Sequence, residues 1–152
     1  MASRTITWVA LGLIAIGLVG CSTSAWTAKE MTPGAGEAAN VLFYLSNQSS
    51  ERPLVTMSVY VDGQLALRRT MRDAMAGGKH GFPEEFKLRL PPGPHTLRVV
   101  AEGLAASDTV EVVVGVKPRY VDASYDYWRN RHGAGQTGVV SIHVGDEPPG
   151  FC

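Results

Sequence analysis

The sequence has no excess of either charge. Its 152 residues carry 14 Lys and Arg against 14 Asp and Glu. Residues 1–20 contribute one basic side chain, Arg4, and no acid, so the remainder has 13 basic and 14 acidic side chains. Such a balance gives no long-range field that would attract the phosphates of a nucleic acid. We therefore expect no nucleic-acid partner.

The sequence motifs of common enzymes are missing as well. No serine lies in Gly-x-Ser-x-Gly, no His-Glu-x-x-His occurs, and no phosphate-binding glycine loop precedes a helix. The histidines His80, His95, His132 and His143 lie far apart, without the spacing of metal ligands. We expect a turn position for His95 and an exposed one for His143. The sequence therefore predicts no enzyme, no metal site and no bound cofactor.

Long hydrophobic runs are absent. The most apolar stretch extends from Trp8 to Val19, whereas a membrane-spanning helix needs about 20 apolar residues. Arg4 is the only charge before this stretch, and small residues follow it, which is typical of a secretory signal peptide. We therefore assign residues 1–20 to a signal peptide that is removed.

The end of this segment, Leu18-Val19-Gly20-Cys21, resembles the lipobox of bacterial lipoproteins. The resemblance implies that cleavage occurs before Cys21, that its thiol receives a diacylglycerol and that its new amino group is acylated. Several acyl chains hold a protein on a bilayer, whereas one chain binds marginally. Ser22 rather than Asp follows Cys21, which in Gram-negative lipoproteins implies the outer membrane, facing the periplasm. The alternative is an ordinary cleaved signal with an incidental cysteine.

Cysteine is scarce, with only Cys21 and Cys152 in the chain. If Cys21 is acylated, Cys152 is left alone in an oxidising compartment, and no internal disulfide can form. The 132 residues from Cys21 onward are enough to bury a core without such a bond.

What the sequence does have is a change of pattern near residue 40. Residues 21–39 are rich in Ser, Thr, Ala, Gly and Pro and predict a flexible linker. From residue 40 to 145, apolar side chains alternate with others, as expected for half-buried strands. The alternating groups are Val41–Leu45, Val55–Val61, Leu65–Leu67, Phe86–Leu90, Leu97–Ala101, Val110–Val116, Val121–Tyr127 and Val140–Val144.

Turn residues separate these groups. Asp62-Gly63 is a two-residue hairpin signal, because its turn needs positive φ at both central positions. Pro91-Pro92-Gly93-Pro94 and Lys117-Pro118 interrupt strands, since proline has no amide hydrogen to donate. The pattern predicts an all-β domain over 40–145, a single antiparallel β-sandwich of about eight short strands. Residues 146–152 are expected to form a C-terminal tail.

Part of this domain carries recognisable motifs. Tyr60-Val61-Asp62-Gly63 is followed by Leu90-Pro91-Pro92-Gly93-Pro94-His95-Thr96-Leu97, and then by Gly103 and the apolar stretch Val110–Val116. This arrangement is similar to PEGA-type and related immunoglobulin-like or transthyretin-like modules of bacterial envelope proteins. The likeness covers roughly residues 55–116 and implies a sandwich topology. The chain departs from the PEGA pattern where a polar insertion, Thr70–Glu85, replaces a short connection.

The candidate binding residues follow the seventh alternating group. They are Tyr125, Tyr127, Trp128, Arg129, Arg131 and His132. Aromatic and arginine side chains are typical of recognition surfaces, and aromatic rings also stack on sugars. The alternative is that Tyr125 and Tyr127 complete the core, with Trp128 covering its end. The insertion Thr70–Glu85 is a second candidate, because long loops in compact domains are often functional.

Together these features predict a non-catalytic, lipid-anchored envelope lipoprotein that acts as a protein-binding or assembly module in the periplasm. The expected partners are the membrane, through the lipid anchor, and another envelope protein, because a sandwich offers edge strands and end loops. Two alternatives stay open. One is a lipoprotein that binds glycan, peptidoglycan or a metal through the Tyr125–His132 loop, and the other is an assembly lipoprotein of a secretion machine.

Overall fold

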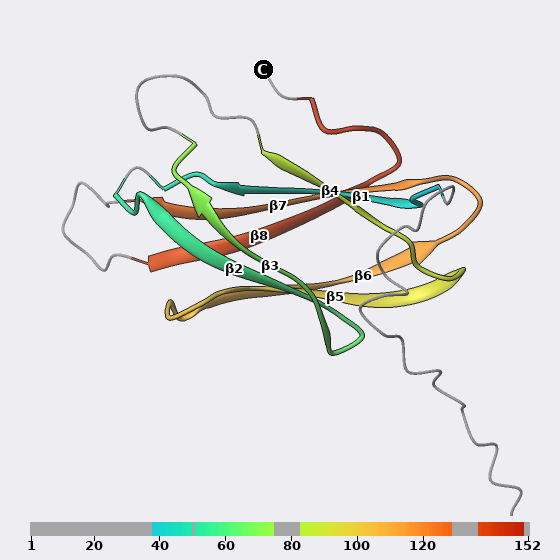
Figure 1. Ribbon diagram of the computed structural model, residues 1–152, viewed down its shortest axis with the longest axis horizontal. Coiled ribbons are helices and arrows are strands. Elements are labelled where there is room, and N and C mark those ends of the chain that lie inside the picture. Colours follow the sequence, from blue (N-terminus) through green and yellow to red (C-terminus); the bar gives the residue numbers. More distant parts are fainter. Residues whose placement is uncertain (1–37, 50, 75–82, 129–136, 151–152) are drawn as a thin grey trace, which may run out of the picture.

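The chain forms eight strands in two layers (Figure 1). The computed structural model describes residues 38–49, 51–74, 83–128 and 137–150. The strands are β1 (Val41–Asn47), β2 (Leu54–Val61), β3 (Gln64–Arg72), β4 (Glu84–Leu88), β5 (Gly93–Ala101), β6 (Ala106–Val114), β7 (Arg119–Trp128) and β8 (Thr137–Gly145). The predicted all-β sandwich of about eight short strands is confirmed.

Each layer is a four-stranded sheet. Sheet A has the order β4-β1-β7-β8, and sheet B has the order β3-β2-β5-β6. The described strands pair antiparallel, as predicted, except that β1 and β7 run parallel. A parallel pair needs a long crossover connection. Here β2 to β6 lie between β1 and β7 in the sequence. The connection between these two strands of sheet A therefore includes all four strands of sheet B.

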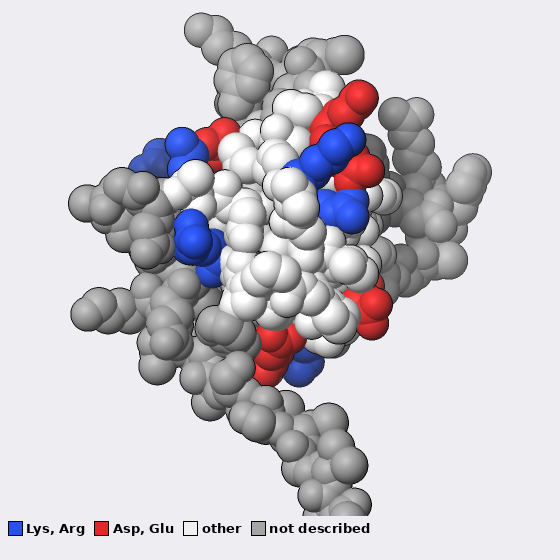
Figure 2. Space-filling model, turned by 90° about the vertical axis from the view of Figure 1, so that its right-hand side faces the viewer, with Lys and Arg blue, Asp and Glu red and all other residues white. Residues whose placement is uncertain are grey.

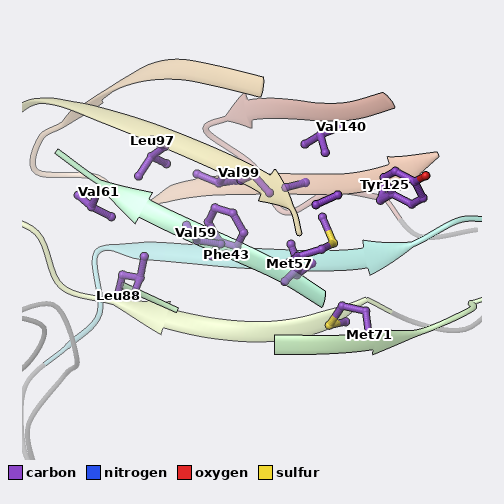
Figure 3. Close-up of a cluster of buried hydrophobic side chains, with 14 of the residues drawn as sticks. Phe43, Met57, Val59, Val61, Met71, Leu88, Leu97, Val99, Tyr125 and Val140 are labelled. Carbon is purple, nitrogen blue, oxygen red and sulfur yellow. The ribbon is translucent and has the colours of Figure 1, made fainter. Parts of the chain in front are cut away.

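The core lies between the sheets, as the period-two pattern predicts. Alternate residues of the central strands and of β6 point inward, and the fully buried ones include Phe43, Met57, Leu97 and Val112. Figure 3 shows such side chains from both sheets meeting in one cluster. Burial of apolar surface of this kind is the main favourable contribution to folding.

Three predicted inward positions, Leu65, Val116 and Val144, are exposed, and the first two are wrong for a local reason. A bulge between Val59 and Tyr60 shifts the register, so Leu65 pairs with Tyr60 on the outer face and is 45% exposed. Strand β6 ends at Val114 rather than continuing to residue 116, and Val116 is fully exposed in the following turn. In both cases alternation continues in the sequence after the strand geometry has changed.

The turns follow the prediction more closely. Asp62 and Gly63 have φ of 49° and 80°, the positive values that a two-residue hairpin requires. The interruption at 91–94 is shorter than expected, because β5 already begins at Gly93 and Pro94 pairs with Val113.

The insertion Thr70–Glu85 is partly strand. Residues 70–72 complete β3 and Glu84 opens β4. The two strands face each other across one open side of the sandwich, where Arg69 Nε donates to Glu84 Oε2 at 2.8 Å. Residues 75–82 lie outside the described part of the chain, as do the predicted signal peptide and nearly all of the predicted linker. No helix in the described residues is long and apolar enough to cross a membrane.

Candidate binding site at the far end of the sandwich

The strands of the sandwich run between two opposite ends, which we call the entry end and the far end (Figure 1). The entry end holds residue 38, the start of β1 and the connections β4–β5 and β6–β7. The far end holds the end of β1, the turn β5–β6, the end of β7 and the start of β8. Strand β1 has seven residues and therefore spans about 20 Å between them.

The middle of the entry end carries little charge. Figure 2 looks onto this end and shows an uncharged surface with acidic and basic side chains around it. The exposed residues of the two connections here include the uncharged Pro92, Val116 and Pro118, and also the basic Arg89 and Lys117.

Polar groups at the entry end hydrogen-bond to one another. The Asn40 side chain donates to the Leu90 carbonyl at 2.5 Å and accepts from the Leu90 amide at 2.8 Å. His95 is buried, with Nδ1 2.7 Å from Asp62 Oδ2 and Nε2 2.9 Å from the Pro91 carbonyl oxygen. Asp62 Oδ1 also accepts from the Thr96 amide at 2.8 Å. These bonds join the β2–β3 hairpin to the start of β5.

The expectation of a turn position for His95 is therefore wrong. The residue belongs to β5 and points into the sandwich, because the strand begins earlier than the proline pattern suggests. His143 is exposed, as predicted. His80 and His132 lie outside the described residues. Within the described ranges, no three His, Cys, Asp or Glu side chains form a set that could hold a metal ion.

The turn after β1 forms one wall of the far end. Asn47 is fully buried, and its side chain donates to the Arg52 carbonyl at 2.8 Å and accepts from the Ser49 amide at 3.1 Å. Ser49 Oγ in turn accepts from the Arg52 amide at 3.0 Å. Buried polar side chains of this kind fix the path of a turn. They hold the backbone of Arg52 in place over the end of β7.

A cavity of about 360 Å³ opens beside Arg52. It is lined by Arg52, Tyr125, Tyr127, Gly138 and the turn 103–106. The Arg52 guanidinium carbon lies 5.1 Å from the centre of the Tyr127 ring, within the range of a cation–π contact. Arg52 Nε is buried and has no hydrogen-bond partner in the part of the chain that the structure describes. We call this cavity the Arg52 pocket.

Tyr125 forms the inner wall of the pocket. Figure 3 shows its ring at one end of the core cluster, with the hydroxyl oxygen directed away from the other labelled side chains. Burial raises the pKa of Tyr125, and the nearby Arg52 charge opposes that shift. A Cβ atom at Gly138 would overlap the Tyr125 hydroxyl and lie 2.6 Å from two ring carbons. Glycine at 138 therefore leaves room for the Tyr125 ring.

The candidate binding residues fall into two groups. Tyr125 and Tyr127 are buried, with 1% and 7% of their surface exposed, so they complete the core and also line the pocket. Neither ring is an open platform for stacking on a sugar. Trp128 ends β7, but its side chain, and all of Arg129, Arg131, His132 and Cys21, lie outside the described residues.

Arg52 is the residue that the sequence did not single out. It lies in a polar turn between two alternating groups, where arginine is common, and its tyrosine partners are more than 70 positions away. No sequence signal marks it, because the parallel pairing of β1 with β7, which brings the turn after β1 beside the end of β7, is seen only in the structure.

The outer face of sheet A carries a second polar feature. Asp122 lies between Tyr44 and His143 in the register of β1, β7 and β8. Burial raises the pKa of Asp122, the neighbouring Asp126 adds to the shift, and His143 opposes it. The shift results from partial burial on a sheet surface.

Comparison of this chain with family models, with curated proteins and with solved structures finds no match.

Proposed function

We propose that the protein is a non-catalytic, lipid-anchored binding module of the bacterial cell envelope, and that its far end engages another envelope protein. In this proposal Cys21 carries the lipid and holds the domain at the outer membrane, on the periplasmic side. The observation that carries the proposal is the separation of the two ends: the chain enters at one end, and the Arg52 pocket opens at the other.

The anchor is supported by sequence. Leu18-Val19-Gly20-Cys21 follows an apolar stretch of signal-peptide length, and Ser22 favours transfer to the outer membrane. Residues 21–39 then connect the anchor to the entry end. The little charge in the middle of that end suits a surface close to a bilayer (Figure 2).

A binding role is supported by the far end. Ligand sites are concave, largely preformed and contain few polar groups, and the Arg52 pocket has these properties. Arginine and tyrosine are also the residues most often found at the centre of protein interfaces. Tethering at the entry end leaves this pocket at the end of the domain opposite the tether.

The hydrogen bonding of His95 supports a non-catalytic role. A general base needs a ring nitrogen within reach of the proton it removes. The ring nitrogens of the buried His95 face Asp62 and the Pro91 carbonyl, so His95 stabilises the adjoining turns and has no nitrogen for a substrate.

Replacement of Cys21 tests the anchor. We expect the parent to begin at Cys21 with the mass of its lipid chains and to sediment with outer membranes. Cys21→Ser should remain an uncleaved or mislocalised precursor, whereas Cys152→Ser should behave as the parent does. Ser22→Asp should move the protein to the inner-membrane fraction. If Cys21→Ser is still processed before residue 21 and sediments like the parent, the lipoprotein assignment is wrong.

A further inference from the structure

The Arg52 pocket contains a cation without an anionic partner. No carboxylate among the described residues pairs with Arg52, and no acidic side chain lines the cavity. The guanidinium instead lies over the Tyr127 ring with its Nε–H enclosed and unbonded. Burying a charged donor without an acceptor is costly, so a ligand that supplies an acceptor gains that energy on binding.

The second cavity near this end differs in charge. It has a volume of about 390 Å³ and is lined by Arg69 and Arg72 together with Asp73 and Glu84. Arg69 is already paired with Glu84 at 2.8 Å. Its mixed charges give no preference for an anion, so the Arg52 pocket is the stronger candidate.

The chemistry of the pocket selects the kind of anion. One guanidinium balances one negative charge, whereas a doubly charged phosphate would keep an uncompensated charge in a partly enclosed site. A carboxylate also matches the planar edge of a guanidinium, which can donate two parallel hydrogen bonds. Leu104, Ala105 and Ala106 form a wall of small apolar residues beside the cation. A small apolar group attached to the carboxylate would lie against this wall.

We propose that the Arg52 pocket binds the carboxylate of a peptide with small apolar side chains. In this proposal Arg52 pairs with the carboxylate, and the Tyr127 ring packs against the guanidinium. The inference rests on the proposed function, because it names the chemical group by which an envelope protein is recognised. The Nε–H edge is enclosed without ligand, so binding includes a small rotation of the guanidinium. That rotation breaks no ion pair to a described carboxylate, because none pairs with Arg52, and it can retain the contact with the Tyr127 ring.

Calorimetric titration of the full chain with three peptides tests the proposal. The first is N-acetyl-Ala-Ala-Ala with a free C-terminal acid, the second is the same peptide as its amide, and the third is N-acetyl-Ala-Asp-Ala amide. We expect the free acid to bind at least tenfold more tightly than the amide. The third peptide separates the two sources of a carboxylate, a chain terminus and an acidic side chain. Equal binding of all three, or none, overturns the proposal.

Variants at Arg52 assign the binding to the pocket. Arg52→Met should weaken binding of the free-acid peptide at least tenfold. The affinity of Arg52→Lys should lie between those of the parent and Arg52→Met, because lysine keeps the charge and loses the planar edge. Arg98→Met is the matched control, since Arg98 is exposed on the outer face of sheet B. Melting temperatures show whether each variant is folded. If Arg52→Met and Arg52→Lys are folded and bind like the parent, the carboxylate site is not this pocket.

Membrane fractionation of the same proteins separates the two proposals. Loss of membrane attachment in Cys21→Ser together with no carboxylate binding by the parent would overturn the inference alone. Carboxylate binding by a parent chain that is neither lipidated nor attached to membranes would overturn the envelope function alone.

Discussion

The two ends of the sandwich differ in the hydrogen bonding of their buried polar groups. At the entry end, Asn40 and His95 each make two short hydrogen bonds, and both partners of His95 lie in turns. At the far end, Asn47 is satisfied in the same way, but the Nε of Arg52 has no partner. A satisfied buried group stabilises a fold, whereas an unsatisfied one costs stability. The entry end is therefore built for stability, and the far end retains a group that a ligand can satisfy.

This contrast predicts that changes at the entry end lower stability without affecting carboxylate binding. Changes at Arg52 should have the opposite effect. The following substitutions test that separation, beginning with the scaffold that both ends share.

Val112→Asp should have the largest effect, because it removes the support of both ends at once. Val112 is fully buried between the sheets, and an unpaired charge there should cost about 4 kcal/mol or more. Glu111→Lys, on the exposed face of the same strand, should change the free energy of unfolding by less than about 0.5 kcal/mol. Thermal melting measures both. Equal melting temperatures would contradict the assignment of the two faces of β6.

His95→Leu should have the next largest effect and should be confined to stability. The change keeps a similar side-chain volume but leaves the Pro91 carbonyl and one Asp62 oxygen without their contacts to the imidazole, at a cost of about 2–3 kcal/mol. Binding of N-acetyl-Ala-Ala-Ala by the folded fraction should stay as in the parent. Thr96→Val is the control, because only the Thr96 backbone bonds to Asp62. A His95→Leu variant with the melting temperature of the parent but without peptide binding would contradict the roles assigned to the two ends.

Gly138→Ala should affect stability and binding together. The new methyl group overlaps the Tyr125 hydroxyl, so the ring must shift, at a cost of about 1–3 kcal/mol. The shift should also alter the inner wall of the Arg52 pocket and weaken peptide binding. Gly115→Ala at the entry end has open space around its Cβ and should leave both properties unchanged. Unfolding and calorimetry of the two variants check this. Parent-like binding by Gly138→Ala would show that Tyr125 does not shape the pocket.

Asp122→Asn should have the smallest effect and should appear only in the pH dependence. Burial raises the pKa of Asp122 above its ordinary 3.8, so the folded chain binds this proton more tightly than the unfolded chain does. The carboxylate therefore lowers stability as pH rises through the window from 3.8 up to the raised pKa. Asp122→Asn should melt slightly higher at neutral pH, with no gain below that window. A gain that is equal at every pH would contradict the raised pKa.

Much of the fold could be predicted from the sequence, because strand patterns and short turns are local. The alternation of Val121, Ala123, Tyr125 and Tyr127 identified an inward face, and the burial of these four residues agrees with it. The hairpin at Asp62-Gly63 was equally clear, since positive φ is a property of the two turn residues themselves.

The features that the sequence did not predict depend on contacts between residues far apart in the sequence. His95 takes its partners from Asp62 and Pro91, and the Arg52 pocket joins a turn at residue 52 to tyrosines on β7. The parallel pairing of β1 with β7 brings this turn beside the tyrosines. Alternation alone does not reveal which strands become neighbours. Local pattern therefore predicts the strands, whereas the site arises from their order.

The central claim is that the far end, and not the entry end, is the binding end. The most direct measurement is a titration of the ¹⁵N-labelled full chain, in detergent micelles, with N-acetyl-Ala-Ala-Ala, followed through backbone amides and arginine Nε–Hε signals. The account predicts that the Arg52 Nε–Hε signal and the amides of residues 103–106 and Gly138 shift together and saturate. The amides of Asp62, Leu90 and Arg119 at the entry end should stay in place. Shifts that gather at the entry end, or an unmoved Arg52 signal at saturating peptide, would contradict it.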